Sequence, residues 1–288
     1  MNSSPEITPQ DFDFFKIALG SKDFILLDHL GLKTPLLPEY YQRVAAQICP
    51  RFRGVGAASL IVLVPGHDDI PRLLQFTPGD PENLPVFDAL MAAAKYLFDT
   101  ARYGISLIPL WQGKNIIQVE PLDSSNFRLT LGTARSASQI LGPEDLKTAK
   151  WTVDLGDTTL TGIPLELGAE ILVFFNSPSK PKAKKKWLKS FKKVPRLQGR
   201  IPVLVDLISP EEIEITLAPE SLETDVVAVS ALSALAVQLE GFCNDQVLVR
   251  CRNHPVFVEI SGPQRILKIT APVIYIFTGS FSLRDDKI

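Results

Sequence analysis

Apolar residues recur along this chain at two different spacings, and each spacing predicts a different type of secondary structure. Two stretches place apolar residues at every third or fourth position, which predicts long helices over Leu84 to Tyr103 and Asp225 to Gly241. Thr224 or Asp225 can cap the second helix, and its closing glycine fits a helix end. A third helix is predicted over Pro38 to Ile48, because a proline is well placed in a first turn.

Between these helices the pattern changes to short apolar or alternating runs, which predict strands. The predicted strands are Phe14 to Asp28 with a turn at Gly20, Leu60 to Val64, Arg72 to Phe76, Ser106 to Trp111, Asn115 to Val119, Asn126 to Leu131, Lys150 to Leu155, Ile171 to Phe175, Ile201 to Leu207, Glu212 to Leu217, Gln246 to Cys251, Val256 to Ser261, and Arg265 to Phe277 with a break at Pro272. Each half of the chain thus has many strands around one long helix. This predicts an α+β class with a duplicated architecture.

Length and composition are those of a globular protein. The chain has 288 residues, 45% of them hydrophobic and 22% charged, which is enough for two domains with sizeable cores. No apolar run reaches the roughly 18 residues of a membrane span, and the polar, acidic segment Met1 to Asp13 is unlike a signal peptide. We therefore expect a cytoplasmic protein. Its three cysteines match no zinc spacing and are expected to be reduced, without a metal.

Charge is unevenly spread. The segment Lys180 to Arg200 has eight lysines, two arginines and no acidic residue, and the remaining 20 basic and 32 acidic residues give the rest of the chain a net charge of −12. Within it, Trp187, Leu188, Phe191 and Val194 fall on one helical face. The candidate polyanion-binding residues are Lys184, Lys185, Lys186, Lys189, Lys192 and Lys193. Either this is a surface helix with solvated lysines, or it binds an anionic membrane, nucleic acid or an acidic protein.

Six stretches of the chain, in order and at matching distances, resemble the motifs of one enzyme family. They are Phe15 to Phe24, Arg51 to Ala57, Phe76 to Leu97, Val153 to Leu165, Glu223-Thr224, and Ile269 to Phe277. The second, for example, is similar to an Arg-His-Phe-Gly-Ile-Gly-Ala loop. The family is diaminopimelate epimerase, and the resemblance covers residues from about 14 to 281.

The resemblance implies two tandem lobes, each a curved, mostly antiparallel sheet around a central long helix. The expected lobes are residues 1–118 with 271–288, and residues 119–270, because the family's closing strand returns to the first lobe. The family's active site lies in the cleft between the lobes and needs no cofactor. Two cysteines, each at the start of a central helix, remove and return the α-proton of an amino acid.

Both cysteine positions are valines in this chain, Val86 and Val227. Valine neither accepts nor donates a proton. Neighbouring glycines are also replaced, by Phe87 among others. Their side chains keep a substrate carboxylate from approaching the backbone N–H groups. Asparagines that hold the family's substrate fall at Lys22, Thr77 and Ile201 here, and a Glu-Arg pair falls at Ala218 and Pro219. The protein is therefore not expected to racemise or epimerise amino acids.

The candidate pocket-lining residues are Lys22, Thr77, Val86, Phe87, Asp88, Ile201, Ala218, Pro219, Glu223, Thr224 and Val227. Most are apolar, so burying a zwitterion there would cost several kcal/mol per charged group. Lys22 is either a base of lowered pKa or a solvated turn residue, and Asp88 either contacts a ligand or complements its helix dipole. One hypothesis is a cleft rebuilt for a neutral or apolar metabolite, in a cofactor-independent isomerase or cyclase. The other is a pseudoenzyme that serves as a binding or scaffold protein, as a monomer or homodimer.

Overall fold

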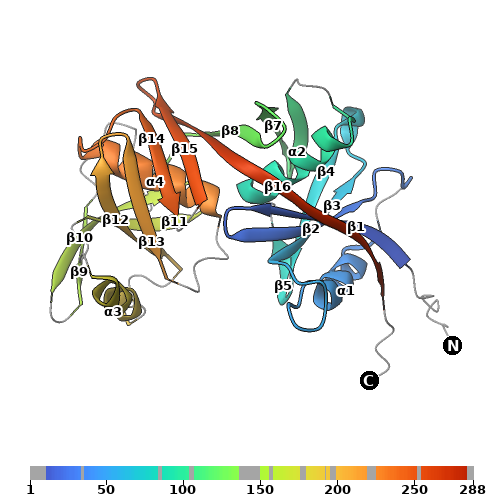
Figure 1. Ribbon diagram of the computed structural model, residues 1–288, viewed down its shortest axis with the longest axis horizontal. Helices are drawn as coiled ribbons and strands as arrows, with labels where there is room; N and C mark the ends of the chain where they lie inside the picture. Colours follow the sequence, from blue (N-terminus) through green and yellow to red (C-terminus); the bar gives the residue numbers. More distant parts are fainter. Residues whose placement is uncertain are drawn as a thin grey trace. The chain divides into compact units, whose positions relative to one another are not determined.

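The computed structural model describes residues 11–33, 36–83, 86–103, 107–135, 150–155, 158–175, 180–191, 193–194, 199–218, 225–251 and 254–283 (Figure 1). The chain divides into two compact units. Unit 1 consists of Met1–Gln118 and Val273–Ile288, and unit 2 consists of Val119–Pro272.

Strands and helices alternate in the same way in both units. The elements up to the first boundary are β1 (Asp11–Leu19), β2 (Lys22–Asp28), α1 (Pro38–Ile48), β3 (Ser59–Val64), the 3-10 turn η1 (His67–Asp69), β4 (Arg72–Thr77), β5 (Asp80–Asn83), α2 (Phe87–Asp99), β6 (Ile108–Gln112) and β7 (Asn115–Pro121). They are followed by β8 (Asn126–Gly132), β9 (Trp151–Asp154), β10 (Thr159–Glu166), β11 (Glu170–Phe174), α3 (Pro181–Phe191), β12 (Ile201–Ser209), β13 (Glu212–Leu217), α4 (Val226–Leu239), β14 (Gln246–Cys251), β15 (His254–Ser261) and β16 (Ile266–Ser282).

The strand pairing repeats as well. In unit 1, β1 and β2 are antiparallel, β2 and β3 are parallel across α1, β3 and β4 are antiparallel, and β4 and β6 are parallel across α2. In unit 2, β10, β11, β12, β13 and β14 follow the same order across α3 and α4. The sheet is therefore mixed: most of its pairs are antiparallel, as expected, and each helical crossover adds a parallel pair.

The last strand, β16, crosses the boundary between the units. Its first part pairs with β8 and β15, and its second part, from Val273 on, pairs with β1. The order β1-β2-β3-β4-β6-β7-β8-β16 closes on itself through the β1–β16 pair, as an eight-stranded barrel. The expected break at Pro272 is wrong, because this proline lies where the ladder with β8 ends and the ladder with β1 begins, so that its missing N–H interrupts neither.

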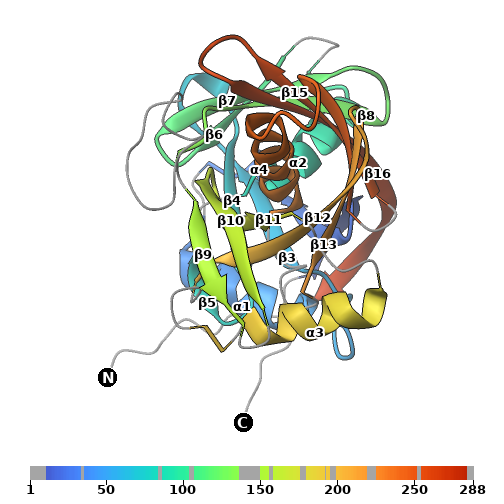
Figure 2. The same ribbon diagram turned by 90° about the vertical axis from the view of Figure 1, so that its left-hand side faces the viewer.

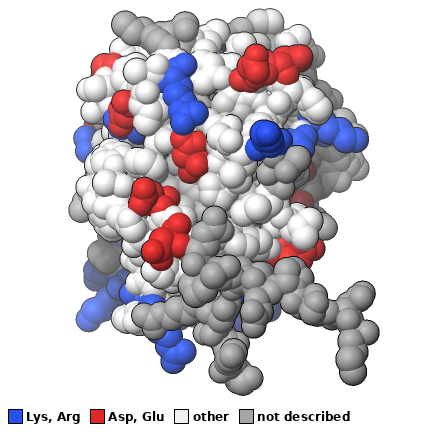
Figure 3. Space-filling model, turned by 90° about the vertical axis from the view of Figure 1, so that its right-hand side faces the viewer, with Lys and Arg blue, Asp and Glu red and all other residues white. Residues whose placement is uncertain are grey.

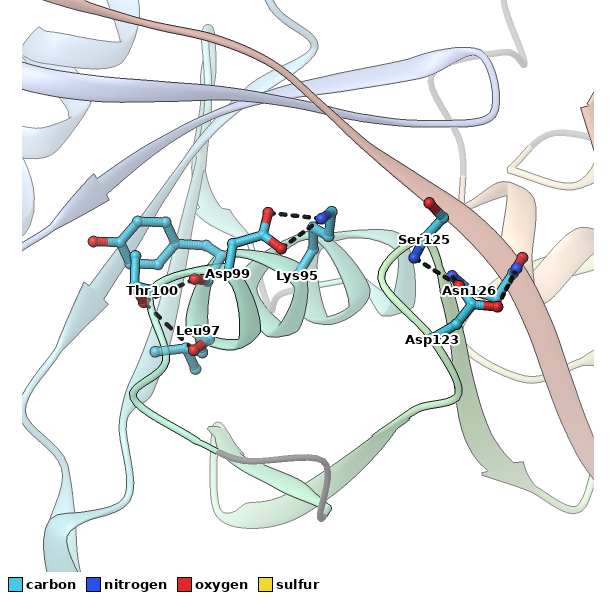
Figure 4. Close-up of polar contacts among 8 residues, drawn as sticks. Lys95, Leu97, Asp99, Thr100, Asp123, Ser125 and Asn126 are labelled. Atoms are coloured by element: carbon cyan, nitrogen blue, oxygen red, sulfur yellow. Dashed lines mark hydrogen bonds and ion pairs between the residues drawn. The ribbon is translucent and has the colours of Figure 1, made fainter.

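The two helices α2 and α4 have 13 and 14 residues, fewer than the long central helices expected. Val86 has extended backbone angles, so α2 begins at Phe87. At the other end, the Thr100 hydroxyl donates to the carbonyls of Tyr96 and Leu97, and Ala101 takes a positive φ of 54° (Figure 4). These local contacts end the helix before Tyr103.

Each unit has one helix on the outside of its strands and one that the strands enclose. In α4 every residue except Gln238 is buried, and the helix contacts β10, β11, β13, β14 and β15 (Figure 2). Its many alanines and two serines, Ser230 and Ser233, are small enough for strands to approach on all sides. Outside, α1 packs Tyr41 and Val44 on strands of unit 1, and α3 packs Leu188 and Phe191 on strands of unit 2.

Two strands were not predicted as such. β10 contains Gly162 and Pro164, which favour other structures, and β5 contains Pro81. A turn joins β7 to β8, and in it the Asp123 carboxylate accepts hydrogen bonds from the backbone N–H groups of Ser125 and Asn126 at 2.7 and 2.8 Å (Figure 4).

Among the described residues, no helix has the length and hydrophobicity of a membrane span.

Candidate functional site

The start of α2 carries Val86, the first of the two positions at which the resemblance implies a cysteine. Val86 is its N-cap residue, and its backbone N–H donates to the Gln75 side-chain oxygen at 2.9 Å. The Gln75 amide nitrogen in turn donates to the Ser59 hydroxyl at 3.0 Å, and both polar side chains are buried. The N–H of Val86 is therefore bonded within the protein and is not offered to an anion.

A buried ion pair lies directly beside this position. Lys22, at the start of β2, places its Nζ 3.9 Å from the Asp88 carboxylate in the first turn of α2. The side chains are 5% and 0% exposed, so Lys22 is not a solvated turn residue. Its Nζ also lies 5.8 Å from the ring centre of Phe24. Two opposite charges removed from water are stable only as a pair, so each of these side chains needs the other.

The remaining described candidates of unit 1 lie at the ends of the neighbouring elements. Thr77 is the last residue of β4 and is half-buried, and Phe87 is the first residue of α2 and is half-buried too. Lys22, Asp88 and Val86 therefore form the part of the candidate site that the structure brings together.

The corresponding place in unit 2 is apolar. Asp225 caps α4 by accepting a hydrogen bond from the Ala228 N–H at 3.0 Å, and Val227 is fully buried. Ile201 begins β12 and is half-buried, and Ala218 lies in the apolar cluster under α3. Pro219, Glu223 and Thr224 lie outside the described residues. Ile201, Ala218 and Val227, the described candidates of unit 2, thus carry no ionisable side chain.

A second polar cluster joins two of the stretches that resemble family motifs, Phe15 to Phe24 and Arg51 to Ala57. The sequence did not predict this cluster. Asp23 accepts two hydrogen bonds from Arg51, at 2.8 and 3.1 Å, and its carboxylate lies 2.7 Å from Lys16. Lys16 also donates to the carbonyl of Gly56. Burial acts to raise the pKa of Asp23, but the bonds from Arg51 and Lys16 outweigh it and hold the pKa below its usual value. Asp23 therefore holds the loop as a carboxylate at neutral pH.

The backbone conformation of that loop requires its two glycines, Gly54 and Gly56. A Cβ on Gly54 would lie 2.4 Å from the carbonyl oxygens of Gln47 and Ile48, and Gly56 has a φ of +85°. Both positions require glycine for steric reasons. The loop motif therefore has a structural function here, whatever ligand it binds in other proteins.

None of the three cysteines resembles a reactive thiol. Burial raises the pKa of Cys49 and of Cys243 to about 12, and Cys251 is buried. Thiols of such high pKa stay protonated at neutral pH and are poor nucleophiles. In the described part of the chain no group of three or more His, Cys, Asp or Glu side chains is placed to hold a metal ion.

Two cavities lie away from the start of α2. One, of about 240 Å³, is in unit 1 near the other end of that helix, where Arg102 and Tyr103 line it. The other, of about 500 Å³, is in unit 2, and Phe175, Trp187, Phe242 and the ion pair of Lys150 and Glu240 line it. None of the pocket-lining candidates from the sequence contributes to either cavity.

The basic segment forms the helix α3, as its periodicity indicated. Phe191 stacks on Phe174 with ring centres 4.7 Å apart, so the apolar face is packed against unit 2. Lys184 pairs with Asp206. The exposed lysines are Lys182, Lys185, Lys186, Lys189 and Lys193, and the side chain of Lys192 lies outside the described residues. Elsewhere charges of both signs are interspersed, as on the face shown in Figure 3.

The sequence matches no protein-family model and no curated protein. Solved structures, however, match over nearly the whole chain. A hydroxyproline epimerase from Agrobacterium vitis, with bound trans-4-hydroxy-L-proline, has a TM-score of 0.66 at 10% identity and covers 96% of this chain and 94% of its own. Methylitaconate-delta-isomerase has a TM-score of 0.66 at 10% identity, over 96% of both chains. A phenazine biosynthesis protein of the PhzF family from Bacillus anthracis has 0.63 at 11% identity, over 94% and 99%.

These epimerases and isomerases share a diaminopimelate epimerase-like fold, and the present chain has that fold. Identities this low establish the likeness of the fold and nothing about the residues of a site. The chemistry must therefore be argued from the side chains of this chain.

Proposed function

We propose that the protein is a cofactor-independent isomerase or cyclase that acts on a neutral or apolar metabolite and uses Lys22 and Asp88 in place of a cysteine pair. One observation carries the proposal. A buried lysine of β2 and a buried aspartate in the first turn of α2 lie 3.9 Å apart, beside the position at which the resemblance implies the first reactive thiol.

The chemistry follows from the two ionisation states of such a pair. A buried carboxylate accepts a proton more readily than one in water when its partner is displaced, and an ammonium group can then donate one to the substrate. An apolar surrounding such as Val86 disfavours a zwitterion, because its charges would lose their hydration without gaining partners. It suits an unsaturated or aliphatic substrate, which an apolar site can orient while excluding water.

The test is solvent isotope exchange. The purified protein is incubated in D2O with a protein-free extract of small metabolites, and mass spectrometry follows deuterium incorporation and the appearance of isomers of the same mass. We expect at least one compound to change with the wild-type protein and not with Lys22→Met or Asp88→Asn. The matched control is Lys95→Met, since Lys95 is also buried and pairs with Asp99 in the same helix at 2.6 Å (Figure 4). Equal conversion by the Lys22 variant and the wild type contradicts the proposal.

A second candidate function, binding of a polyanion by a catalytically inactive protein, is favoured by the surface of α3. Its apolar face is already buried against unit 2, so the helix cannot insert into a lipid bilayer in the manner of an interfacial helix. Its exposed lysines instead form a flexible cationic surface without arginines, which suits nonspecific attraction to phosphate or carboxylate groups.

This candidate is tested with vesicles that contain phosphatidylserine and, separately, with double-stranded DNA, at low and at high salt. Binding should weaken steeply with salt because counterions are released. Lys185→Glu with Lys189→Glu should abolish it, whereas Lys33→Glu with Lys114→Glu, the same charge change at exposed lysines outside α3, should not. Equal loss in both double variants would show that net charge, and not this helix, determines binding.

A further inference from the structure

The cavity of about 500 Å³ lies within unit 2. Residues of β10 and α3 and residues at the ends of β11 and α4 line it, and Figure 2 shows these four elements. Glu240, the C-cap residue of α4, and Phe242, which follows that helix, are both in its wall. Val227 lies at the opposite end of α4, whose 14 residues span about 21 Å. The cavity is therefore a place distinct from the start of α4.

One part of the cavity lining is aromatic. Phe175 and Phe242 contact each other edge to face, with ring centres 6.0 Å apart and ring planes at 70°. Trp187 of α3 contributes a third, half-buried ring. Aromatic rings attract a further ring through stacked and edge-to-face contacts. Phe242 is 48% exposed, so a ligand ring placed here would also remove apolar surface of the protein from water.

Another part of the lining is an ion pair. The Lys150 Nζ lies 2.9 and 3.0 Å from the two carboxylate oxygens of Glu240, and the side chains are 44% and 21% exposed. An ion pair that water can screen contributes little to stability, so a ligand can separate these two groups at small cost. A ligand with a single charge would leave one of them unpaired. A zwitterion bonds both through charge-assisted hydrogen bonds, and the pair therefore favours a ligand with an anionic and a cationic group.

The strand β10 adds neutral polar groups. Thr159 and Thr161 line the cavity, and their side chains share one face because alternate residues of a strand do. Among the described strands, β9 pairs with Thr159 to Gly162, whereas β11 pairs with β10 only from Gly162 onward. The described strands thus leave backbone N–H and C=O groups before Gly162 that a polar ligand can bond.

We propose that this cavity binds a free aromatic amino acid in its zwitterionic form. The ring of the ligand lies beside Phe175, Trp187 and Phe242. Its carboxylate bonds to Lys150, and its ammonium group bonds to Glu240. Pockets of roughly 300–1,000 Å³ hold small ligands, and this cavity falls in that range. The inference does not rest on the proposed reaction, whose substrate is neutral or apolar.

The test is isothermal titration calorimetry of the full chain with L-phenylalanine and L-tryptophan. The comparison uses analogues of L-phenylalanine that each lack one group: 3-phenylpropionate has no ammonium group, 2-phenylethylamine has no carboxylate, and L-alanine has no ring. The amino acids should bind, and each analogue should bind at least about tenfold more weakly, which corresponds to about 1.4 kcal/mol. Absence of binding of both amino acids at about 10 mM would overturn the inference, and so would equal binding of L-phenylalanine and either singly charged analogue.

Variants locate the bound ligand. Lys150→Met should weaken the binding of L-phenylalanine by about tenfold and should not weaken that of 2-phenylethylamine, which has no carboxylate for Lys150. Phe242→Ala should weaken both compounds. The matched control is Arg250→Met, because Arg250 and Glu212 form a comparably exposed ion pair of unit 2, at 46% and 26%, that does not line the cavity. This control should bind as the wild type does.

Two results with these variants would overturn the inference. One is wild-type affinity for L-phenylalanine in Lys150→Met, and the other is an equal loss in Lys150→Met and Arg250→Met. Circular dichroism and the melting temperature show whether each variant is folded. Because the assay measures binding without turnover, its outcome is independent of the proposed reaction.

Discussion

The buried pair of Lys22 and Asp88 makes a quantitative prediction about stability. Its charged atoms are 3.9 Å apart, and neither side chain is more than 5% exposed. At an effective dielectric constant of about 20, two unit charges at this distance attract each other by about 4 kcal/mol. Removing one partner leaves the other buried and uncompensated, which costs about 3–5 kcal/mol. Lys22→Met and Asp88→Asn should therefore each lower the free energy of unfolding by about that amount.

The double variant discriminates between two roles of Asp88. If the two side chains stabilise each other, Lys22→Met with Asp88→Asn should cost about 2–3 kcal/mol less than the sum of the single changes. If Asp88 only complements the dipole of α2, its replacement should cost about 0.3–1 kcal/mol and should not depend on Lys22. Guanidinium chloride unfolding at pH 7, followed by circular dichroism, measures all four proteins.

The pair of Lys95 and Asp99 supplies the control cycle. Its atoms are closer, at 2.6 Å, but Asp99 is 30% exposed and water screens its charge. Its coupling should stay within about 1 kcal/mol. Additivity of the Lys22 and Asp88 changes to within about 0.5 kcal/mol would refute the reasoning, because independent sites add to that accuracy.

Four further predictions follow from the described contacts. With valines at both cysteine positions, the protein should not exchange the α-proton of diaminopimelate or of other free amino acids in D2O, and exchange above the uncatalysed rate would contradict this. Cys49 and Cys243, whose pKa values burial raises to about 12, should resist iodoacetamide at pH 8 in the folded protein and react once it is unfolded. Gly54→Ala should lower the unfolding free energy by more than about 1 kcal/mol, because its Cβ would lie 2.4 Å from two carbonyl oxygens; an unchanged melting temperature would show that the loop yields. The pKa of Asp23 is held below its ordinary 3.8, so its carboxylate should stabilise the folded protein above about pH 4. This stabilisation should be lost as the pH falls through the lowered pKa of the folded state. In Asp23→Asn, that acid-induced loss of unfolding free energy should be absent.

Local sequence signals predicted the elements that depend on neighbouring residues. The helix over Pro38 to Ile48 is confirmed at both ends, because proline in the first turn and the apolar spacing act within a few residues. The cap of α4 by Asp225 is confirmed for the same reason. β10 was missed, because Gly162 and Pro164 have poor strand propensity, and only pairing with β9 and β11 makes them part of a strand.

The sequence by itself predicted most of the strands and helices in their order, and it carries a resemblance to a family of two-cysteine epimerases in which valines take the cysteine positions. The tertiary structure decided which polar residues meet. Lys22 belongs to a turn that by sequence could equally be solvated, and it is buried because β2 runs beside the start of α2. Tertiary contacts also bring together one cluster of Lys16, Asp23 and Arg51. Pairing with β1 likewise continues β16 beyond Pro272. These contacts join residues far apart in the chain, and the free energy that fixes them comes from packing and pairing, to which local propensity contributes little.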